Sequence, residues 1–479
     1  MQPGIRWGPF TLRIPFYHFR FEWPETIQGL VVAGATGLAL IPILVDYFGV
    51  DYQVALAIVI VQAALIASAP IVFGDPYCHG WITPAIPLVL AEILAIRARA
   101  APDAADSVVR LEVIQTITAL TLLVAAIFFV GGITGLGRWF VERIPVPLKA
   151  GIILGAAISA FNHELAGSRS YLYVAPYACL TAVAICLVLM FSIPLAQVKV
   201  RARWLAVLSG LGLAPGFIAA ALVGHFISGE FTLSAEGGLE RPPFATMWRE
   251  LSPLSIGWPT AQMFLDVLPL ALVVYVLGFG DIVTANEILH DARRFRPDEK
   301  LDINPTRTHL NIGIRNTLQA LAAGPFPVVH GPLWTGVQVV VTQRYKQGRG
   351  AMDSIYGGIA AYYFWGVPIL LFLRPITTFL RPMLPVALSM TILLTGFACG
   401  YLALALPRNQ AERGVTLTTG MVLAQFGAWQ ALLVGLVMTL VLCGWKTEPP
   451  AAQPAHGHHA GQAPHEPESA AHSEQAAQA

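Results

Sequence analysis

The stretch GDPYCHGWITPAIP, from Gly74 to Pro87, interrupts a part of the chain that is otherwise strongly apolar. It places an aspartate, a cysteine, a histidine and three prolines where an ordinary membrane helix would carry leucines and valines. Proline has no backbone N–H and breaks a helix interior, so this segment cannot form a regular helix. Inside a membrane, such backbone is tolerated only where it is buried in protein or lines a cavity. We therefore expect a broken membrane span here.

The same pattern occurs a second time, in GPFPVVHGPLWTG from Gly324 to Gly336. Both copies read Pro-x-x-His-Gly, at residues 76–80 and 327–331. With 35 Pro, 12 His and 43 Gly in 479 residues, roughly 0.08 such patterns are expected by chance. Each copy is followed by a Trp and a Thr before an apolar run resumes. The pattern indicates an internal repeat with one broken span in each half.

Composition places the chain among polytopic membrane proteins. It is 56% hydrophobic and only 12% charged, with a mean hydropathy of +0.63, which is too apolar for a soluble protein of this length. The net charge of +1 gives no reason to expect a nucleic-acid partner. The five cysteines all lie in or beside apolar runs, so no disulfide framework is expected.

Apolar runs of about 20 residues, each enough to cross a bilayer, recur from residue 27 to residue 445. They form two series of seven, and the third span of each series is the broken one. The first series is 27–47, 52–70, 71–95, 111–136, 146–163, 171–194 and 204–228. The second series is 262–289, 308–325, 326–343, 352–373, 384–406, 415–426 and 428–445. We predict an all-α fold of about 14 transmembrane segments.

Lysine and arginine counts predict the orientation, because positive charge marks short cytoplasmic loops. With the N-terminus inside, 20 of the 29 basic residues fall on the cytoplasmic side, 8 fall on the opposite side, and Arg315 lies inside a span. Both termini are therefore predicted to be cytoplasmic, in a multi-pass protein of a bacterial inner membrane. An odd number of spans per half inverts the second repeat relative to the first.

The chain is predicted to have five parts. Residues 1–26 lack the apolar core of a signal peptide and are expected at the cytoplasmic interface. Two seven-span repeats, 27–228 and 262–445, flank an external loop at 229–261. The tail, 446–479, is rich in Ala, Pro, Gln, Glu and His and is predicted to be disordered.

The tail histidines His456, His458 and His459 are weak candidates for metal binding. A solvated tail and a purification-tag scar are the alternative interpretations.

The two broken spans predict a binding site near the middle of the membrane. Glycine permits tight turns and close backbone approach, and Thr83 or Thr335 can cap a half-helix whose positive end points into a cavity. Two such ends suit an anion or a polarised carbonyl. The predicted substrate-binding residues are His79, Gly80, Trp81, Thr83, His330, Gly331, Trp334 and Thr335. The alternative is a pair of Pro-kinked helices whose histidines bond to neighbouring carbonyls.

Ionisable residues inside spans are functional candidates, because they are costly there. Asp281, in the sequence GFGD, is our first candidate for a proton- or cation-coupling carboxylate, and Asp75 is the second. Arg315 could pair with Asp281 or assist an anion, but its place near the cytoplasmic end of its span favours snorkelling to the interface.

Two passages of the second half resemble known transporters. GFGDIVTANEIL (278–289) is similar to the end of span 8 in nucleobase-cation symporters such as uracil permease, and HLNIGIRNTLQALAAGPFPVVHG (309–331) to their passage from span 9 to span 10. The Pro-x-x-His-Gly pattern is also similar to that of molybdate-type sulfate permeases, which lack a C-terminal regulatory domain. The resemblance to this superfamily covers about residues 27–445.

This resemblance implies seven plus seven inverted spans, with spans 3 and 10 each formed by a short strand and a half-helix. It implies a core domain of spans 1–4 and 8–11, a gate domain of spans 5–7 and 12–14, and a homodimer through the gate domain. Nucleobase symporters carry glutamates in span 8 and just after the glycine of span 10. This chain has Val276 or a neighbour and Pro332 at those positions.

We therefore expect a secondary active transporter for a small anion, coupled to protons or another cation and using no cofactor. A nucleobase permease for xanthine or uracil is the alternative within the superfamily. A membrane-embedded metalloenzyme using Cys78, His79 and His330 is a remote alternative, because no H-E-x-x-H helix accompanies these residues. A passive channel would need a polar stripe along a pore, and the spans offer few polar positions.

Overall fold

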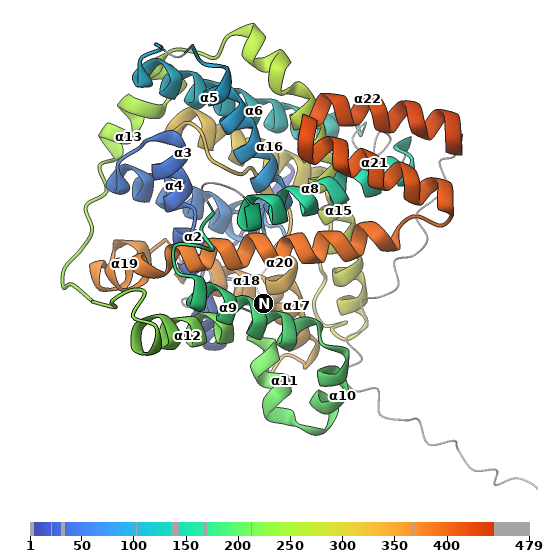
Figure 1. The fold of residues 1–479 in the computed structure, drawn as a ribbon. Helices are drawn as coiled ribbons and strands as arrows, with labels where there is room; N and C mark the ends of the chain where they lie inside the picture. The colour runs from blue at the N-terminus through green and yellow to red at the C-terminus, as the bar shows by residue number, and fades with distance from the viewer. Residues whose placement is uncertain are drawn as a thin grey trace, which may run out of the picture.

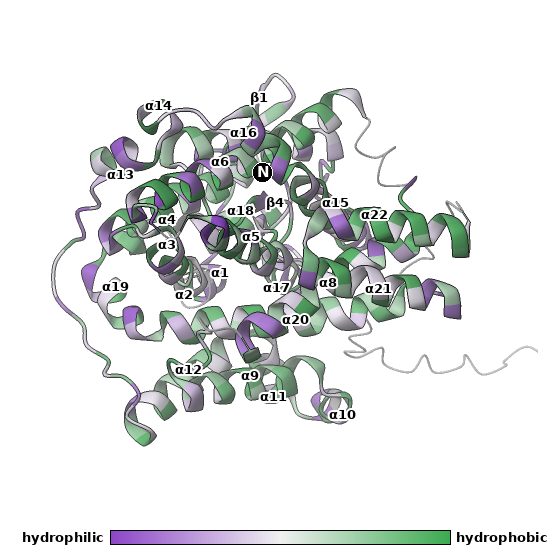
Figure 2. Ribbon diagram, turned by 45° about the horizontal axis from the view of Figure 1, so that its top comes forward, coloured by the Kyte–Doolittle hydropathy of each residue, from purple (hydrophilic) through white to green (hydrophobic). Residues whose placement is uncertain are grey.

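The computed structural model of the chain describes residues 4–20, 22–29, 34–101, 103–135, 143–166, 170–211, 213–365 and 368–444. Most of these residues are helical (Figure 1). Within these ranges, four helices are long and apolar enough to cross a membrane, namely Tyr52–Phe73, Asp106–Thr134, Ala261–Arg293 and Arg374–Ala405. Apolar residues dominate the helices, and polar residues gather toward their ends (Figure 2). The predicted helical membrane class is confirmed, while the count of fourteen spans stays a prediction.

Helices make up most of the described first half of the chain. They are α1 (Trp23–Gln28), α2 (Gly34–Leu38), α3 (Ile41–Phe48), α4 (Tyr52–Ser68), α5 (Ile86–Arg99), α6 (Asp106–Thr134), α8 (Val146–Ala166), α9 (Pro176–Phe191), α10 (Ile193–Arg201), α11 (Arg203–Gly210), α12 (Ala214–Leu222) and the π-helical turn η4 (Val223–Ile227). The third span is broken, as expected. It consists of the π-helical turn η2 (Ala69–Phe73), strand β3 (Gly80–Trp81), the 3₁₀ turn η3 (Thr83–Ala85) and α5.

The second half begins with two short helices, α13 (Phe244–Leu251) and α14 (Pro253–Ile256). Its elements are α15 (Ala261–Arg293), α16 (Pro305–Ala323), strand β4 (His330–Gly331), α17 (Thr335–Lys346), α18 (Ile355–Ala360), η5 (Ala361–Trp365), η6 (Leu370–Phe372), α19 (Arg374–Leu380), η7 (Arg381–Met383), α20 (Leu384–Ala405), α21 (Gln410–Phe426), α22 (Ala428–Met438) and η8 (Thr439–Cys443). Strand β4 and α17 form the second broken span.

The helices pack in two groups. In one group, α6 packs on α5, α15 and α16, while α4 contacts α16 and α17 contacts α15 and α18. In the other, α8 packs on α20 and α21, and α9 packs on α12 and α20. Helix α20 runs across the molecule between α8 and α9 (Figure 1). The first group contains both broken spans, so the predicted site lies among its helices.

The two broken spans pair with each other through their strands. Strands β3 and β4 are antiparallel, with Gly80 opposite Gly331 and Trp81 opposite His330. Further backbone bonds extend the bridge on both sides, from Ile82 N to the Val329 carbonyl oxygen (3.1 Å) and from Trp334 N to the Cys78 carbonyl oxygen (2.6 Å). These bonds satisfy backbone groups that the prolines exclude from a helix, which makes the break tolerable inside the fold.

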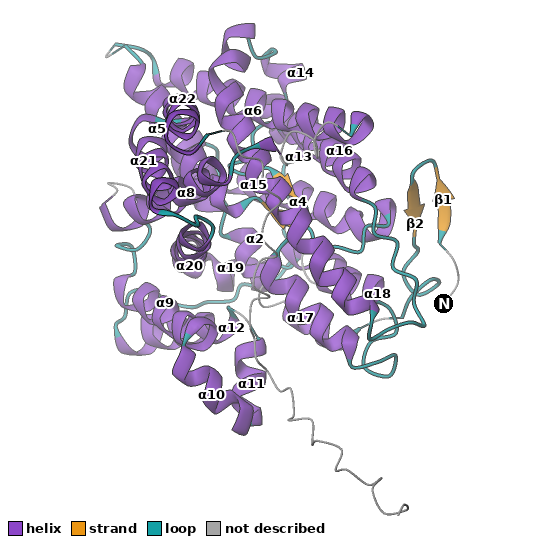
Figure 3. Cartoon of the chain, turned by 90° about the vertical axis from the view of Figure 1, so that its right-hand side faces the viewer, coloured by secondary structure: helices purple, strands orange, loops and turns teal. Residues whose placement is uncertain are grey.

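The N-terminal segment contacts parts of both broken spans. The N-terminal hairpin of β1 (Ile5–Trp7) and β2 (Phe10–Leu12) lies at the edge of the molecule (Figure 3), and Trp7 Nε1 donates to the Val72 carbonyl oxygen at 2.9 Å. Farther along, Glu22 pairs with Arg344 (3.3 Å) and accepts from Asp353 N (3.0 Å). These contacts hold the N-terminal segment against η2, α17 and the loop that follows α17.

Gly80 is required by the close approach of the two broken spans, and its replacement gives the first testable prediction. A Cβ at Gly80 would lie 2.9 Å from the Trp334 Cβ. We expect Gly80→Ala to lower the free energy of unfolding by about 1–3 kcal/mol, because overpacking forces backbone shifts. The matched control is Gly414→Ala in α21, where a Cβ meets nothing within 4 Å. Thermal unfolding in detergent measures both; equal stability of the two variants would contradict the tight bridge.

Candidate functional site

The antiparallel bridge brings both repeat histidines against one side chain, that of Arg315 on α16. Arg315 Nη2 lies 2.7 Å from His79 Nδ1, and Arg315 Nη1 lies 3.5 Å from His330 Nδ1. The same guanidinium reaches the Gly331 carbonyl oxygen (3.4 Å) and donates through Nε to Asn311 Oδ1 (2.7 Å). His79, His330 and Arg315 are all buried. The structure thus joins two predicted site residues to a cation that was not among the predicted binding residues.

Arg315 carries a charge that no carboxylate among the described residues balances by contact. Its side chain is 0% exposed, and its partners are an amide oxygen, two imidazole nitrogens and a peptide carbonyl. Arginine stays protonated in proteins, and an unpaired buried charge is costly. The expectation that Arg315 snorkels to the cytoplasmic interface is wrong, because its contacts with the bridge hold it inside the fold. A buried cation of this kind is suited to an anionic ligand.

The contact with Arg315 selects the neutral form of His79 and its tautomer. A guanidinium can only donate hydrogen bonds, so the Nδ1 atom that faces Arg315 accepts. The other nitrogen, Nε2, lies 3.2 Å from Asp75 Oδ2 and therefore carries the proton that it donates to the carboxylate. His79 is thus a neutral imidazole held between a cation and an anion.

Asp75 fixes this arrangement from the other side. Its carboxylate is fully buried and accepts from Arg307 Nε (3.0 Å), Thr308 Oγ1 (3.2 Å) and Asn311 Nδ2 (2.8 Å) as well as from His79. Arg307 is also buried, and it pairs as well with Asp302, which precedes α16. Arg307 therefore has carboxylate partners, unlike Arg315.

Side chains also hold the backbone of the two strands. Asn316 accepts from His330 N through Oδ1 (2.8 Å) and donates to the His330 carbonyl oxygen through Nδ2 (3.0 Å). On the other strand, Gln338 Oε1 accepts from Cys78 N (2.6 Å), and Gln338 Nε2 donates to Thr342 Oγ1 (3.1 Å). Helices α16 and α17 therefore clamp one broken span each, which sets the positions of both histidines.

Most of the residues that sequence reasoning missed lie on one face of α16. This inward stripe recurs at helical spacing, and all its members are buried: Arg307, Thr308, Asn311, Arg315, Asn316 and Gln319. Residues three and four apart lie on the same face of a helix. The sequence does contain a sign of these residues, namely polar side chains at helical spacing within an apolar chain. Such a pattern predicts a helix whose polar face is buried in the protein.

Several buried polar atoms near the bridge have no hydrogen-bond partner among the described residues. They are Trp81 Nε1, His330 Nε2 and both amide atoms of Gln319. Trp81 and His330 are directly paired across the bridge, so their side chains leave the same face of the two-stranded ladder. Gln319 lies one turn beyond Arg315 on the same face of α16. One cation and several free polar groups together suit a small anion with more than one hydrogen-bonding atom.

The other predicted binding residues lie beside the bridge. Thr83 Oγ1 donates to the Trp81 carbonyl oxygen (3.4 Å) and does not cap a helix, contrary to expectation. The Trp334 ring packs against the Tyr362 ring at 6.2 Å. The backbone of Thr335 begins α17, and its side chain lies outside the described part of the chain. The tail candidates His456, His458 and His459 lie outside the described residues as well.

The structure separates the two candidate coupling carboxylates. Asp75 belongs to the cluster, whereas Asp281 lies on α15 and makes no hydrogen bond or ion pair with any described residue. Asp281 is half-buried and lies within electrostatic range of Cys399 on α20. Asp281 therefore lies where the two groups of helices face each other.

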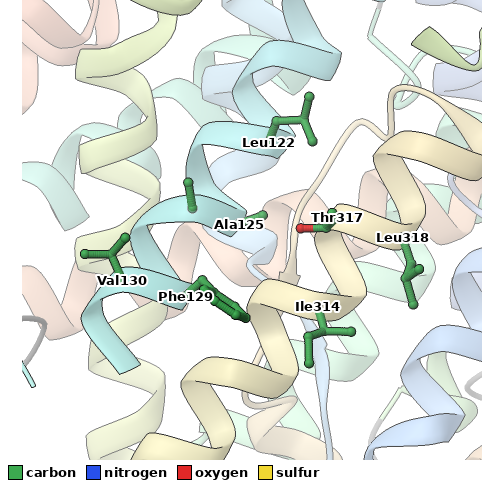
Figure 4. Close-up of a pocket in the computed structure, with 8 residues that line it drawn as sticks. Leu122, Ala125, Phe129, Val130, Ile314, Thr317 and Leu318 are labelled. Atoms are coloured by element: carbon green, nitrogen blue, oxygen red, sulfur yellow. The ribbon is translucent and has the colours of Figure 1, made fainter. Parts of the chain in front are cut away.

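Two cavities lie away from the contacts between Arg315 and the histidines, and they differ in polarity. The larger, of about 490 Å³, is an apolar groove between α6 and α16, lined by Leu122, Ala125, Ala126, Phe129, Val130, Ile314, Thr317 and Leu318 (Figure 4). The hydroxyl of Thr317 already donates to the Gly313 carbonyl oxygen (2.8 Å). The smaller, of about 200 Å³, lies between the N-terminal hairpin and the start of α16, beside Arg6 and Arg307. Neither cavity is lined by His79, His330 or Arg315.

The described residues contain no group of three or more His, Cys, Asp or Glu side chains that could hold a metal ion. His79 and His330 both face a guanidinium, which is incompatible with a bound cation at their Nδ1 atoms.

Comparison with known proteins supports the fold. The chain is similar to the transmembrane domain of a cyanobacterial bicarbonate transporter, BicA, with a TM-score of 0.50 and 14% sequence identity over 87% of this chain and 99% of that one. SLC26A9 matches with a TM-score of 0.49 and 12% identity, over 88% of this chain and 64% of that one. No protein-family model matches the chain, and no curated protein matches it. The likeness to the BicA domain shows that the two proteins share an overall fold.

Proposed function

We propose that the chain is a secondary active transporter that binds a small anion between His79, His330 and Arg315 and carries it across the membrane. The observation that carries this proposal is the buried guanidinium of Arg315, which lies where the two broken spans cross and has no carboxylate partner among the described residues. An anion at this point would balance the charge. The free polar atoms of Trp81, His330 and Gln319 would orient it.

The transport step we propose is movement of a core domain against a gate domain. The core comprises spans 1–4 and 8–11, and the gate comprises spans 5–7 and 12–14, in two inverted repeats with both termini cytoplasmic. The separate packing of α4, α6, α15, α16 and α17 on one side and α8, α9, α12, α20 and α21 on the other supports this division. Coupling would use a proton or cation at Asp281 or in the Asp75 cluster, and a dimer would form through the gate domain.

Small inorganic anions are the substrates we propose to test first. Bicarbonate heads the series because the BicA domain, whose fold is similar, belongs to a bicarbonate transporter. Chloride, nitrate, sulfate and molybdate complete it. A nucleobase is less well supported, since the one carboxylate of the described cluster, Asp75, already accepts from four side chains.

Alanine variants of the two histidines test this proposal. We expect His79→Ala and His330→Ala each to lower anion uptake into proteoliposomes by about 10- to 100-fold, because each removes a hydrogen-bond partner that positions the Arg315 guanidinium, an interaction of about 1.5–3 kcal/mol. His290→Ala, at an exposed position of α15, is the matched control. Uptake at the wild-type rate in both site variants would show that the site is assigned wrongly.

A further inference from the structure

The Nδ1 atom of His79 faces two groups that make opposite demands on it. Arg315 Nη2, at 2.7 Å, is a donor and needs a lone pair. The Gly331 carbonyl oxygen, at 3.1 Å, is an acceptor and needs a proton. Only one demand can be met at a time, because a single nitrogen atom cannot offer both a lone pair and a proton in the plane of its ring.

Both protonation states of His79, neutral and positively charged, therefore have hydrogen-bond partners within reach of their two nitrogens. In the neutral state, Nδ1 accepts from Arg315 and Nε2 donates to Asp75. In the protonated state, Nδ1 would donate to the Gly331 carbonyl oxygen and Nε2 would still donate to Asp75. The change requires only that Arg315 withdraw its N–H group from the ring, since a guanidinium and an imidazolium repel each other.

Resting on the proposed function, we propose that the anion and His79 compete for Arg315, so that each anion that binds is accompanied by one proton on His79 Nδ1. The anion draws the guanidinium away from the ring, which frees the lone pair for a proton from the same aqueous side. On release at the other side, Arg315 returns to His79 and the proton leaves from Nδ1. For a monovalent anion, the empty and loaded sites then carry the same total charge.

The surroundings of His79 favour this assignment over the alternatives. The charged and titratable groups that face His79 and its partner Arg315 are Asp75 and Tyr77 from its own segment, Arg307 and Arg315 from α16, His330 from β4 and Tyr363 from η5. Within the described part of the chain, His79 has a carboxylate on its Nε2 atom, whereas His330 Nε2 has no hydrogen-bond partner. Asp281, the other candidate, is not among the described contacts of Arg315.

The test is the pH dependence of anion binding to the full-length protein in detergent. Chloride, nitrate, sulfate, molybdate and bicarbonate are compared by calorimetry between about pH 5.5 and 8, with bicarbonate held at a constant concentration of its ionised form. If one proton accompanies each anion, the affinity falls by up to tenfold per pH unit as the pH rises through the range in which the free site is unprotonated and the loaded site is protonated. Proton uptake of about one per anion in weak buffer is the direct measurement.

Two asparagine variants separate the histidines. Asparagine places an acceptor near the Nδ1 position and cannot be protonated, so His79→Asn should still bind the anion, but with less than about a twofold change per pH unit. His330→Asn should bind more weakly and keep the full pH dependence. Asp281→Asn should keep it as well.

A full pH dependence in His79→Asn, its loss in Asp281→Asn, or a wild-type affinity that does not change with pH would each overturn the proton assignment while leaving the anion site intact. Absence of binding by every anion in the wild type would instead overturn the proposed function itself.

Discussion

Replacing Arg315 by glutamine is expected to lower anion affinity by about 100-fold without making the anion-free protein less stable. The loss of affinity corresponds to about 3 kcal/mol, within the range for removing one member of a buried charge pair. Stability should be unchanged or higher, because the substitution also removes a buried guanidinium that lacks a carboxylate partner among the described residues. Calorimetric binding and thermal unfolding of the same samples measure the two quantities.

Weaker anion binding together with unchanged stability distinguishes a binding residue from a structural one. Arg315→Lys keeps the charge but loses the planar fork that reaches both histidines, so we expect an intermediate affinity. If Arg315→Gln bound anions normally and unfolded several degrees lower than the wild type, Arg315 would be a structural residue. The proposal that Arg315 binds the anion would then be wrong.

Replacing Asp75 by asparagine is expected to have the opposite signature, a large loss of stability. The Asp75 carboxylate lies 3.0 Å from Arg307 Nε, and both side chains are buried. Breaking a buried pair by removing one partner costs about 3–5 kcal/mol, since the other charge stays buried. The variant also leaves Arg307 and Arg315 together in one cluster without the carboxylate between them. Thermal or chemical unfolding in detergent measures the loss.

A double-mutant cycle identifies the cause of this loss. Arg307→Gln alone should also destabilise, whereas Asp75→Asn combined with Arg307→Gln should recover part of the stability, because no uncompensated charge then remains at that pair. Losses that simply add would mean that the two residues do not interact energetically. Arg307→Gln thus serves as the matched control for Arg315→Gln: both remove a buried guanidinium from α16, but only Arg307 is ion-paired.

Much of the fold could be predicted from the sequence because its signals are local. Apolar runs long enough for a span, prolines that exclude helix and the repeated Pro-x-x-His-Gly pattern depend on residues within a few positions of one another. Both predicted breaks are present, and each contains a two-residue strand: β3 follows His79, and β4 begins at His330. The pairing of β3 with β4 accords with the implied meeting of the two broken spans.

The chemistry at the centre of the site was decided by the tertiary structure. Arg315 and His79 are 236 positions apart, and Asp75 and Arg307 are 232 positions apart, so no local pattern links them. From the sequence alone, Arg315 resembled an interfacial arginine, and Asp281 was the preferred functional carboxylate. The sequence by itself determined where the helices break and which histidines stand at the breaks, since those follow from local backbone preferences. Only the crossing of the two breaks against α16 decided that the histidines share one buried guanidinium, because contacts between distant segments depend on how whole helices pack.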